Sequence, residues 1–331
     1  MSTILVSGVG GGVGQSILKS LQGSSHEVIA ADSFPLAAGI YAASKSYLVP
    51  LPSDPNYIDA LLEICRSERV CILFPGLDEE LPVLSAARER FKKIGVTAVV
   101  SDPEVVAMCD DKLATARLLS ANGFSAPRTC LLAEDVLSIL SFPMVLKPRC
   151  GGCRSKGVFV VESVQELRQR LSQLEPSRYV AQEWIDGDEY TCGTVNFSGE
   201  CLGVILLRRI LRNGDTYKAF VVKDPQLTEF VKNVMQVLRP FGPCNAQLRV
   251  RDSIPYIFEF NARCSGTTAC RSLAGFNEPL MIANYLLLGQ QPVFDIREIS
   301  ILRYWKELVV EPNKIFQFTK DGRIEGAGNW L

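Results

Sequence analysis

The pattern of hydrophobic segments changes once along the chain, and this change constrains the fold more than any other feature of the sequence. Over the first hundred residues, short hydrophobic segments typical of strands alternate with helical patterns. Strands that alternate with helices predict a parallel sheet. From Pro143 onward, strand patterns follow one another with few helices between them, which predicts a mostly antiparallel sheet. We therefore expect α/β and α+β architecture in one chain.

Turn residues and helix caps bound the individual segments. The first part has strand patterns at 3–8, 27–33, 71–76 and 95–100 and helical patterns at 13–21 and 57–68. Asp102 before Pro103 predicts the start of a further helix. Asp110 or Asp111 can cap the next helical pattern, and Gly123 can end it. The second part has strand patterns at 143–148, 157–161, 179–185, 189–197, 201–211, 245–250 and 255–263 and a helical pattern at 164–174.

Length and composition place the chain among ordinary globular proteins. At 331 residues it is long enough for about two domains, and its 47% hydrophobic residues suffice for sizeable cores. The 35 basic and 36 acidic residues nearly cancel, which predicts neither a nucleic-acid nor a membrane partner. Eleven scattered cysteines, an odd number without framework spacing, indicate reduced thiols. Without a leader pattern or a membrane-spanning apolar run, we expect a cytoplasmic protein.

A glycine-rich turn follows the first predicted strand and precedes a helix. Gly8 to Gly14 have the position of a dinucleotide-binding turn, and Asp32 ends the next strand about twenty residues on. The strict spacing G-x-G-x-x-G fails, because Val13 stands where the third glycine is expected. Two alternatives stay open: an NAD-dependent oxidoreductase, or a tight strand-to-helix turn in a domain that binds no nicotinamide.

A second glycine-rich loop joins two strand patterns after Pro148. Its glycines and basic residues, with the lysine that ends the preceding strand, are Gly151, Gly152, Gly157, Arg154, Lys156 and Lys147. Backbone amides in such loops form concave anion sites, and the basic side chains add the charge that a polyphosphate requires. The loop leads into a strand, which distinguishes it from a P-loop. It predicts a hairpin loop that covers phosphates, with a solvated basic turn as the alternative.

Two cysteines, Cys150 and Cys153, form a CxxC pair in the same loop. A zinc or redox site would need partners, but no second pair follows at ligand spacing and His26 is the only histidine. The pair therefore does not predict a metal site.

The segment PYIFEFNAR carries an alternating pattern. Strand alternation would place Tyr256, Phe258 and Phe260 on one face and Ile257, Glu259 and Asn261 on the other. A hairpin through residues 251–253 would lay NAQLRV beside this strand and bring Gln247 close to the polar pair.

The polar residues of this hairpin have the chemistry of a magnesium site. The carboxylate of Glu259 and the amide oxygens of Gln247 and Asn261 are hard ligands, and water and phosphate can complete the coordination. Arg263 follows at the strand end, where it can hold a transferred phosphoryl group. The alternative is that these are solvent-facing polar positions of a half-buried sheet.

The segment AQEWIDGDEYT completes a nucleotide site. The strand that ends in Glu183, Trp184 and Ile185 offers backbone donors and acceptors to adenine, and Glu189 just beyond could bind the ribose hydroxyls. Beyond the ribose, the phosphates would lie under the glycine loop, and magnesium would be bound by the hairpin that carries Gln247 and Glu259. Together the segments predict a nucleotide site.

The segments DDK, FPMVLKP with its glycine loop, QEWIDGDEYT, GPCNAQLRV and IFEFNAR occur in this order. As an ordered set they resemble the ATP-grasp enzymes, and most of all one ATP-grasp half of the carbamoyl phosphate synthase large subunit and the related carboxylate-amine ligases. The resemblance covers about residues 1–290. It implies three parts: a parallel Rossmann-like domain at 1–103, a small lid at 104–181, and an antiparallel domain with the metal site at 182–331.

The resemblance also implies residue roles and an activity. By this resemblance Lys112 and Lys147 match the lysines on the ATP phosphates, and Gly151 to Gly157 match the lid loop. Glu183 to Ile185 match the adenine hinge, and Glu189 matches the ribose carboxylate. The magnesium ligands are matched by Gln247, Glu259 and Asn261, and the phosphate-holding arginine by Arg263. Such enzymes convert a carboxylate, or bicarbonate, into an acyl phosphate that an amine attacks, with formation of ADP. Two Mg²⁺ ions are expected, which Mn²⁺ could replace. The partners would be small-molecule carboxylates and amines.

The sequence departs from the family at several points. The arginine motif reads Asn-Ala-Arg where a proline is commoner, and His26 lies outside the grasp, so Lys218 or Arg208 would replace the synthase's histidine. Lys147, Arg208 and Arg263 are the predicted catalytic residues, and Arg209 joins the two arginines as a candidate for holding an acidic substrate.

The chain carries one grasp where the synthase has two, so it is not expected to make carbamoyl phosphate alone. A non-catalytic ATP-binding subunit, in a homodimer or with a partner subunit, stays an alternative. Residues 297–331 are predicted to form strand pairs without an assigned function.

Overall fold

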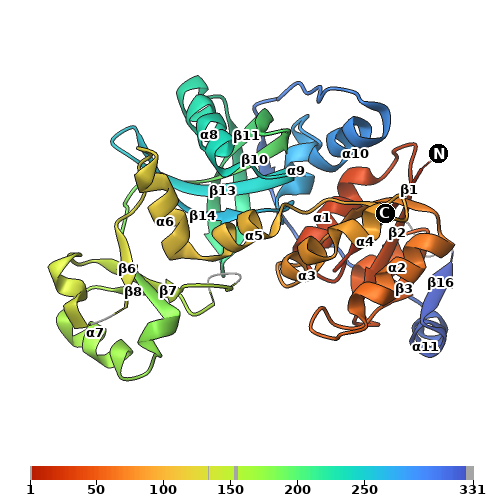
Figure 1. The fold of residues 1–331 in the computed structure, drawn as a ribbon, viewed down its shortest axis with the longest axis horizontal. Helices are drawn as coiled ribbons and strands as arrows, with labels where there is room; N and C mark the ends of the chain where they lie inside the picture. The colour runs from red at the N-terminus through yellow and green to blue at the C-terminus, as the bar shows by residue number, and fades with distance from the viewer. Residues whose placement is uncertain (1, 133, 153–155, 326–331) are drawn as a thin grey trace.

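The structure, a computed structural model, describes residues 2–132, 134–152 and 156–325. It contains three sheets (Figure 1): a parallel one near the N-terminus, a small antiparallel one in mid-chain and a long antiparallel one after it. The predicted combination of α/β and α+β parts is confirmed. No helix in these described ranges is long and apolar enough to cross a membrane.

The first sheet consists of β1 (Thr3–Ser7), β2 (Glu27–Asp32), β3 (Lys45–Leu48), β4 (Val70–Phe74), β5 (Thr97–Ala98) and β16 (Arg323–Glu325). Its order is β16-β3-β2-β1-β4-β5, and all strands except β16 run parallel. The connecting helices are α1 (Gly12–Leu21), α2 (Tyr57–Ser67), α3 (Glu80–Ala86) and α4 (Arg88–Lys92). Every residue of β1 is buried, as expected of a parallel strand covered on both faces.

The small sheet consists of β6 (Thr129–Leu131), β7 (Met144–Pro148), β8 (Phe159–Val161) and β9 (Tyr179–Glu183), in the order β6-β9-β7-β8. Helix α7 (Val164–Leu171) places Leu167 in a core with Met144 and Leu146 that is separate from the other hydrophobic clusters. The unit stands apart from the rest of the chain in Figure 1. The glycine loop joins β7 to β8, as predicted.

The long sheet has the order β14-β13-β10-β11-β12-β15. Its strands are β10 (Asp188–Phe197), β11 (Glu200–Arg212), β12 (Asp215–Val222), β13 (Gly242–Arg251), β14 (Ile254–Asn261) and β15 (Ser300–Leu302). The helices around it are α5 (Pro103–Asp110), α6 (Lys112–Ala121), α8 (Pro225–Leu238), α9 (Thr268–Leu273) and α10 (Glu278–Leu288). Residues of α5, α6 and α8 share one hydrophobic cluster with one face of this sheet. Its opposite face is covered in part by a second cluster, which includes Ile205 and Leu207 of β11.

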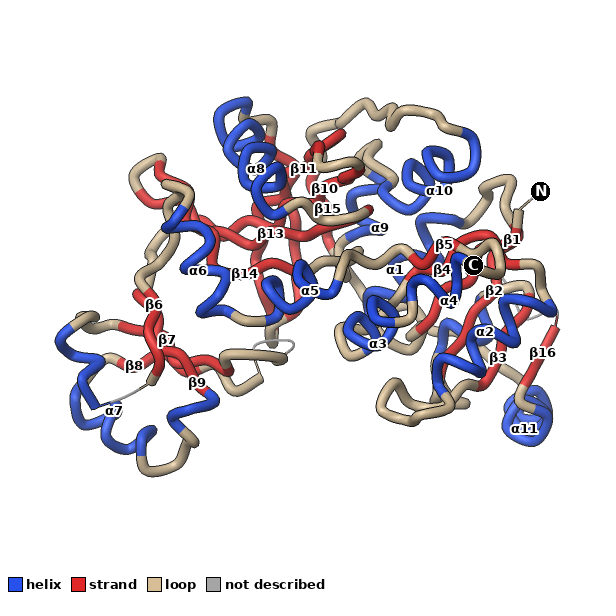
Figure 2. The backbone as a smooth tube through the Cα atoms, in the orientation of Figure 1, coloured by secondary structure: helices blue, strands red, loops and turns tan. Residues whose placement is uncertain are grey.

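One hydrophobic cluster joins the first sheet to the long sheet. Ile17 of α1, Val195 of β10 and Ile282 of α10 belong to it. Figure 2 shows α9 and α10 between the two sheets. These two units therefore form one continuous body, beside which the small sheet has its own core.

The prediction of strand pairs in residues 297–331 is wrong over much of this range. Residues 312–321 form helix α11 (Pro312–Asp321), because Pro312 can occupy its first turn and Gly322, at φ +69°, can end it. Strand β16 then pairs with β3, so the tail completes the first sheet. The predicted domain borders at 103 and 181 stay predictions.

Candidate functional site

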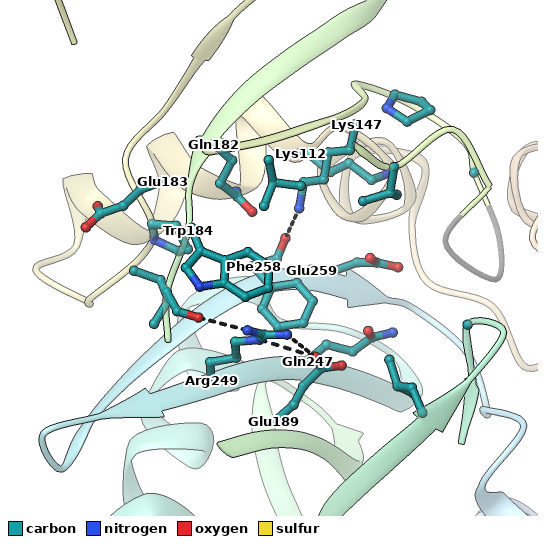
Figure 3. A pocket seen from close by; sticks show the side chains of 18 of the residues that line it. Lys112, Lys147, Gln182, Glu183, Trp184, Glu189, Gln247, Arg249, Phe258 and Glu259 are labelled. Carbon is teal, nitrogen blue, oxygen red and sulfur yellow. Dashed lines mark hydrogen bonds and ion pairs between the residues drawn. The ribbon is translucent and has the colours of Figure 1, made fainter. Parts of the chain in front are cut away.

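A pocket of about 250 Å³ lies between the small sheet and the polar face of the long sheet (Figure 3). One side is lined by β7, the glycine loop and the end of β9, and the other by β10, β11, β13 and β14. Of the predicted site residues, those that line it are Lys112, Lys147, Gly151, Gly152, Glu183, Trp184, Ile185, Glu189, Gln247 and Glu259. Asn261 lies outside the lining.

Strand pairing arranges the polar side chains of the long sheet in rows. Glu189 of β10 stands opposite Arg249 of β13, and two residues further along β13 Gln247 stands opposite Glu259 of β14. Because residues two apart on a strand share a face, both rows face the pocket. The predicted hairpin that brings Gln247 next to Glu259 is confirmed, with Asp252 and Ser253 at positive φ in its turn.

The predicted magnesium ligands lie in hydrogen-bonding contact. Asn261 Nδ2 donates to Glu259 Oε1 at 3.0 Å, and Gln247 Nε2 donates to Asn261 Oδ1 at 3.3 Å. Within the described residues, no group of three or more His, Cys, Asp or Glu side chains could hold a metal. One carboxylate and two amides are hard oxygen donors of low total charge. This set fits Mg²⁺ that arrives with the phosphates of a nucleotide.

The predicted alternation along β14 is wrong at Ile257, which joins Phe260 in the core, and at Phe258, which lines the pocket with Glu259. A register shift between Gln247 and Leu248 leaves Phe258 unpaired as a bulge, so Ile257 turns to the core beside Phe260 instead of sharing the face of Glu259. Phe258 lines the pocket, and its carbonyl accepts a hydrogen bond from Lys147 Nζ at 3.1 Å. The bulge therefore supplies a backbone anchor for a buried lysine.

Two buried lysines face the pocket. Lys147, at the end of β7, is 5% exposed, and burial lowers its pKa to about 8 although the charge of Glu259 opposes this shift. Lys112, at the start of α6, is 7% exposed and donates to the carbonyl of Gly151 at 2.7 Å. Burying two ammonium groups is costly unless an anion compensates them, so the pocket is suited to an anionic ligand.

The loop after β7 has the backbone geometry of the predicted anion site only in part. Gly151, Gly152 and Gly157 have positive φ values of 65°, 87° and 75°, a conformation in which glycine is strongly favoured. Lys156 lines the pocket, whereas Gly157 packs against Pro148 and Tyr179. Cys153 and Arg154 lie outside the described residues.

The hinge segment after β9 is held by an arginine. Arg249 stacks on the ring of Trp184 at 4.4 Å from its centroid and donates to the carbonyl of Ile185 at 3.0 Å (Figure 3). Glu183 pairs with Arg128 and Arg251 at the outer edge. No local sequence pattern indicated the Arg249 contacts, because they depend on how β13 lies beside β10 and the segment before it.

The two adjacent candidate arginines, Arg208 and Arg209, lie differently with respect to the pocket. Arg208 pairs with Asp188 and does not line the pocket, whereas Arg209 does. Successive side chains of a strand point to opposite faces, so only one of the two arginines can reach the site. Lys218, the other candidate, is also outside the pocket lining and lies near the ring of Tyr217.

Arg263 is placed outside the pocket lining. Its Nε and Nη2 donate to the two oxygens of Asp78 at 2.8 and 2.5 Å, and the charge of Asp78 raises its pKa despite burial. This ion pair joins the end of β14 to the first unit. The role of Arg263 on a phosphoryl group stays a prediction.

The first glycine turn is held by the side chain of Asp32 at the end of β2. Asp32 accepts hydrogen bonds from the backbone N–H of Gly10 at 2.6 Å and of Phe34 at 2.9 Å, and it is 8% exposed. The carboxylate that would bind ribose in a nicotinamide site is thus engaged in the loop.

Two protein families match the chain, and the boundary between the two matches lies just after β5 of the first sheet. Residues 4–99 match the N-terminal domain of PylC-like proteins, and residues 109–267 match the ATP-grasp domain.

Individual relatives agree with these matches. D-alanine-D-alanine ligase A of Bacillus cereus is 29% identical over 178 residues, which are 46% of this chain and 57% of that enzyme. The carbamoyl phosphate synthase large chain of Pseudothermotoga lettingae is 22% identical over 312 residues, which are 86% of this chain and 27% of that one. The chain thus spans little more than half of the ligase and about a quarter of the synthase chain.

A solved structure shows the same fold. The N5-carboxyaminoimidazole synthetase of Staphylococcus aureus, crystallised with ADP, superposes with a TM-score of 0.69 over 91% of this chain and 80% of that one. The two sequences are 15% identical, so the similarity concerns the fold.

Proposed function

The chain belongs to the ATP-grasp superfamily, and from this premise we propose that it is an ATP- and Mg²⁺-dependent ligase that activates a carboxylate or bicarbonate as an acyl phosphate for attack by an amine. The observation that carries this proposal is that two buried lysines and the carboxylate of Glu259 line the same pocket. Opposite charges at this position suit a nucleotide whose phosphates contact the lysines and whose metal contacts the carboxylate.

We place the nucleotide along the pocket from hinge to hairpin. Adenine would lie at residues 183–185, against Trp184, and the ribose hydroxyls near Glu189. The phosphates would extend toward Lys112 and Lys147 below the glycine loop. When bound, Mg²⁺ would be held by Glu259 with Gln247 and Asn261, and it would neutralise phosphate charge. The number of metal ions stays a prediction.

The proposed reaction needs no covalent protein nucleophile. A substrate carboxylate oxygen attacks the γ-phosphorus of ATP and ADP leaves; the amine nitrogen then attacks the acyl carbon and phosphate leaves. Lys112 and Lys147 would orient and neutralise the phosphates, which is most of what phosphoryl transfer asks of a protein. The small sheet, with its separate core, would act as a lid that keeps water from the acyl phosphate.

The first experiment measures ATP binding by calorimetry with and without Mg²⁺, for the wild type, Lys147→Met and Glu259→Gln. We expect Mg²⁺-dependent binding that Lys147→Met weakens about 10- to 100-fold and that loses its dependence on Mg²⁺ in Glu259→Gln. Wild-type protein that binds NAD but not ATP would overturn the proposal.

A screen of carboxylates and amines for ADP release then tests the activity. Turnover by the isolated chain would exclude the alternative of a non-catalytic ATP-binding subunit. No observation in the described residues favours the oxidoreductase alternative, because both oxygens of Asp32 already accept backbone hydrogen bonds, from Gly10 and Phe34.

A further inference from the structure

Glu189 is bound by two arginines, although its proposed role needs none. Arg209 Nε and Nη2 donate to its Oε1 at 3.0 and 2.6 Å, and Arg249 Nε and Nη2 donate to its Oε2 at 3.2 and 3.0 Å. The carboxylate is 13% exposed, and one arginine would suffice to balance its charge. The cluster therefore carries a surplus positive charge inside the pocket.

The two arginines differ in their other contacts. Arg249 has independent anchors, the Ile185 carbonyl and the Trp184 ring, which hold it in place whatever Glu189 does. The other contact of Arg209 is the side-chain oxygen of Gln247, to which its Nη2 donates at 2.6 Å. Among the described residues, the side-chain hydrogen bonds of Arg209 thus go only to groups that the nucleotide and its metal would also engage.

We infer that Arg209 is a phosphate-binding residue whose guanidinium moves from Glu189 and Gln247 to a phosphate group of the bound nucleotide. This inference rests on the proposed function. Ribose hydroxyls would donate hydrogen bonds to Glu189 in place of Arg209, and Mg²⁺ would bind the side-chain oxygen of Gln247. Arg209 would then lose both of these partners, and its guanidinium would be free to bind phosphate.

The position of Arg209 supports this exchange. Glu189 lies one row from Gln247 on the sheet, and the side chain of Arg209 contacts both, so it spans the distance between the proposed ribose and metal positions. The phosphates of a nucleotide must cross this distance. The side chain of Arg209 is 10% exposed. A guanidinium that is shielded from water in this way forms strong, bidentate hydrogen bonds to phosphate.

The test compares binding of adenosine, AMP, ADP and ATP, each with Mg²⁺, by calorimetry on wild type and Arg209→Met. We expect adenosine to bind within about twofold of wild type, and ATP to bind about 10- to 100-fold more weakly. The first member of the series that shows the loss identifies the phosphate. Arg208→Met is the matched control, because Arg208 lies on the opposite face, and it should leave the whole series unchanged.

Two results would overturn the inference: an equal loss for adenosine and ATP, which would make Arg209 a support of the ribose carboxylate, or no loss for any ligand. If Arg209→Met does not fold, Arg209→Lys replaces it; this variant keeps the charge without the bidentate fork, and it should weaken ATP, but not adenosine, several-fold. If the wild-type protein binds no nucleotide, the proposed function itself fails. This outcome differs from the two results above, in which the wild type binds nucleotide and only the inference on Arg209 fails.

Discussion

Lys147 carries a charge that can be titrated within the range of a binding assay. Burial lowers its pKa to about 8, so in the free protein the ammonium loses its proton as the pH rises through this value. Because the neutral amine attracts phosphate less, we expect the Kd for ATP to rise from about pH 8 upward. Calorimetry from about pH 7 to about pH 9.5 checks this for the wild type and for Lys147→Arg, whose guanidinium stays charged. The same upward trend in both proteins would contradict the assignment.

Glu80 couples folding to pH in the first unit. Its carboxylate is 1% exposed, accepts a hydrogen bond from Ser7 Oγ at 2.6 Å, and has a pKa raised by burial from 4.5 to about 7. Between these values the folded protein holds a proton that the unfolded chain releases, so this group lowers the free energy of unfolding as the pH rises from 4.5 to about 7.

Replacement of Glu80 by glutamine removes this titration. Urea unfolding at several pH values should therefore show Glu80→Gln gaining stability relative to wild type across the window from 4.5 to about 7. The neighbouring Glu79 is exposed, so Glu79→Gln should show no such trend. A constant difference between Glu80→Gln and wild type at every pH would refute the role of burial.

At the scale of residues, the sequence predicted which side chains form the site better than it predicted which face of a strand each of them lies on. Lys112, Lys147, Glu189 and Glu259 were identified and do meet in one pocket. Arg208 and Arg209 were both candidates, and which of the two faces the pocket depends on the pairing of β11 with β10, which no local pattern reveals.

At the scale of elements, β10 depends on a glycine for room. A methyl group at Gly193 would overlap Arg271 and Glu278, a buried ion pair at 2.7 Å whose side chains are 0% and 1% exposed. Displacing such a pair leaves uncompensated charges, so Gly193→Ala should lower the free energy of unfolding by about 3–5 kcal/mol. Urea unfolding measures this.

The control for Gly193 lies in α1. Gly12 has open space around its Cβ position, and Gly12→Ala should leave stability unchanged or raise it by up to about 1 kcal/mol. If Gly193→Ala costs no more than Gly12→Ala, the buried pair tolerates displacement and the packing argument fails.

The strands and the hairpin were predictable because alternation and turn residues are local signals. The bulge at Phe258 was not, because it appears only when the two strands of the hairpin are aligned and one residue is left without a partner. That single residue decides which side chains of β14 face the pocket.

At the scale of the whole molecule, α11 ties the end of the described chain to the first unit. Phe318 is fully buried, with its ring centroid 6.1 Å from that of Tyr41, whereas Phe316 on the same helix is 70% exposed. Phe318→Ala should therefore cost about 3–5 kcal/mol of unfolding free energy. Phe316→Ala should cost little, and similar losses for both in thermal or urea unfolding would show that the helix is not docked.

The change from a parallel to an antiparallel arrangement followed from hydrophobic patterns, whereas the separate small sheet was implied only by the resemblance and the return of the tail was not predicted. Pairing of β16 with β3 joins residues far apart in sequence, and such contacts leave no trace in either segment alone. Whether a segment forms a helix or a strand depends mainly on its own residues, whereas the sheet that a strand joins depends on the whole fold.

This return has a consequence for proteolysis. Between β15 and α11, Tyr304, Trp305 and Val309 are 83%, 93% and 94% exposed, so the backbone here is open to a protease. The released piece would still be fastened by β3 and by the burial of Phe318. A nicked molecule would thus run as two bands on a denaturing gel but elute from a sizing column as a single particle, a split protein whose fragments complement each other.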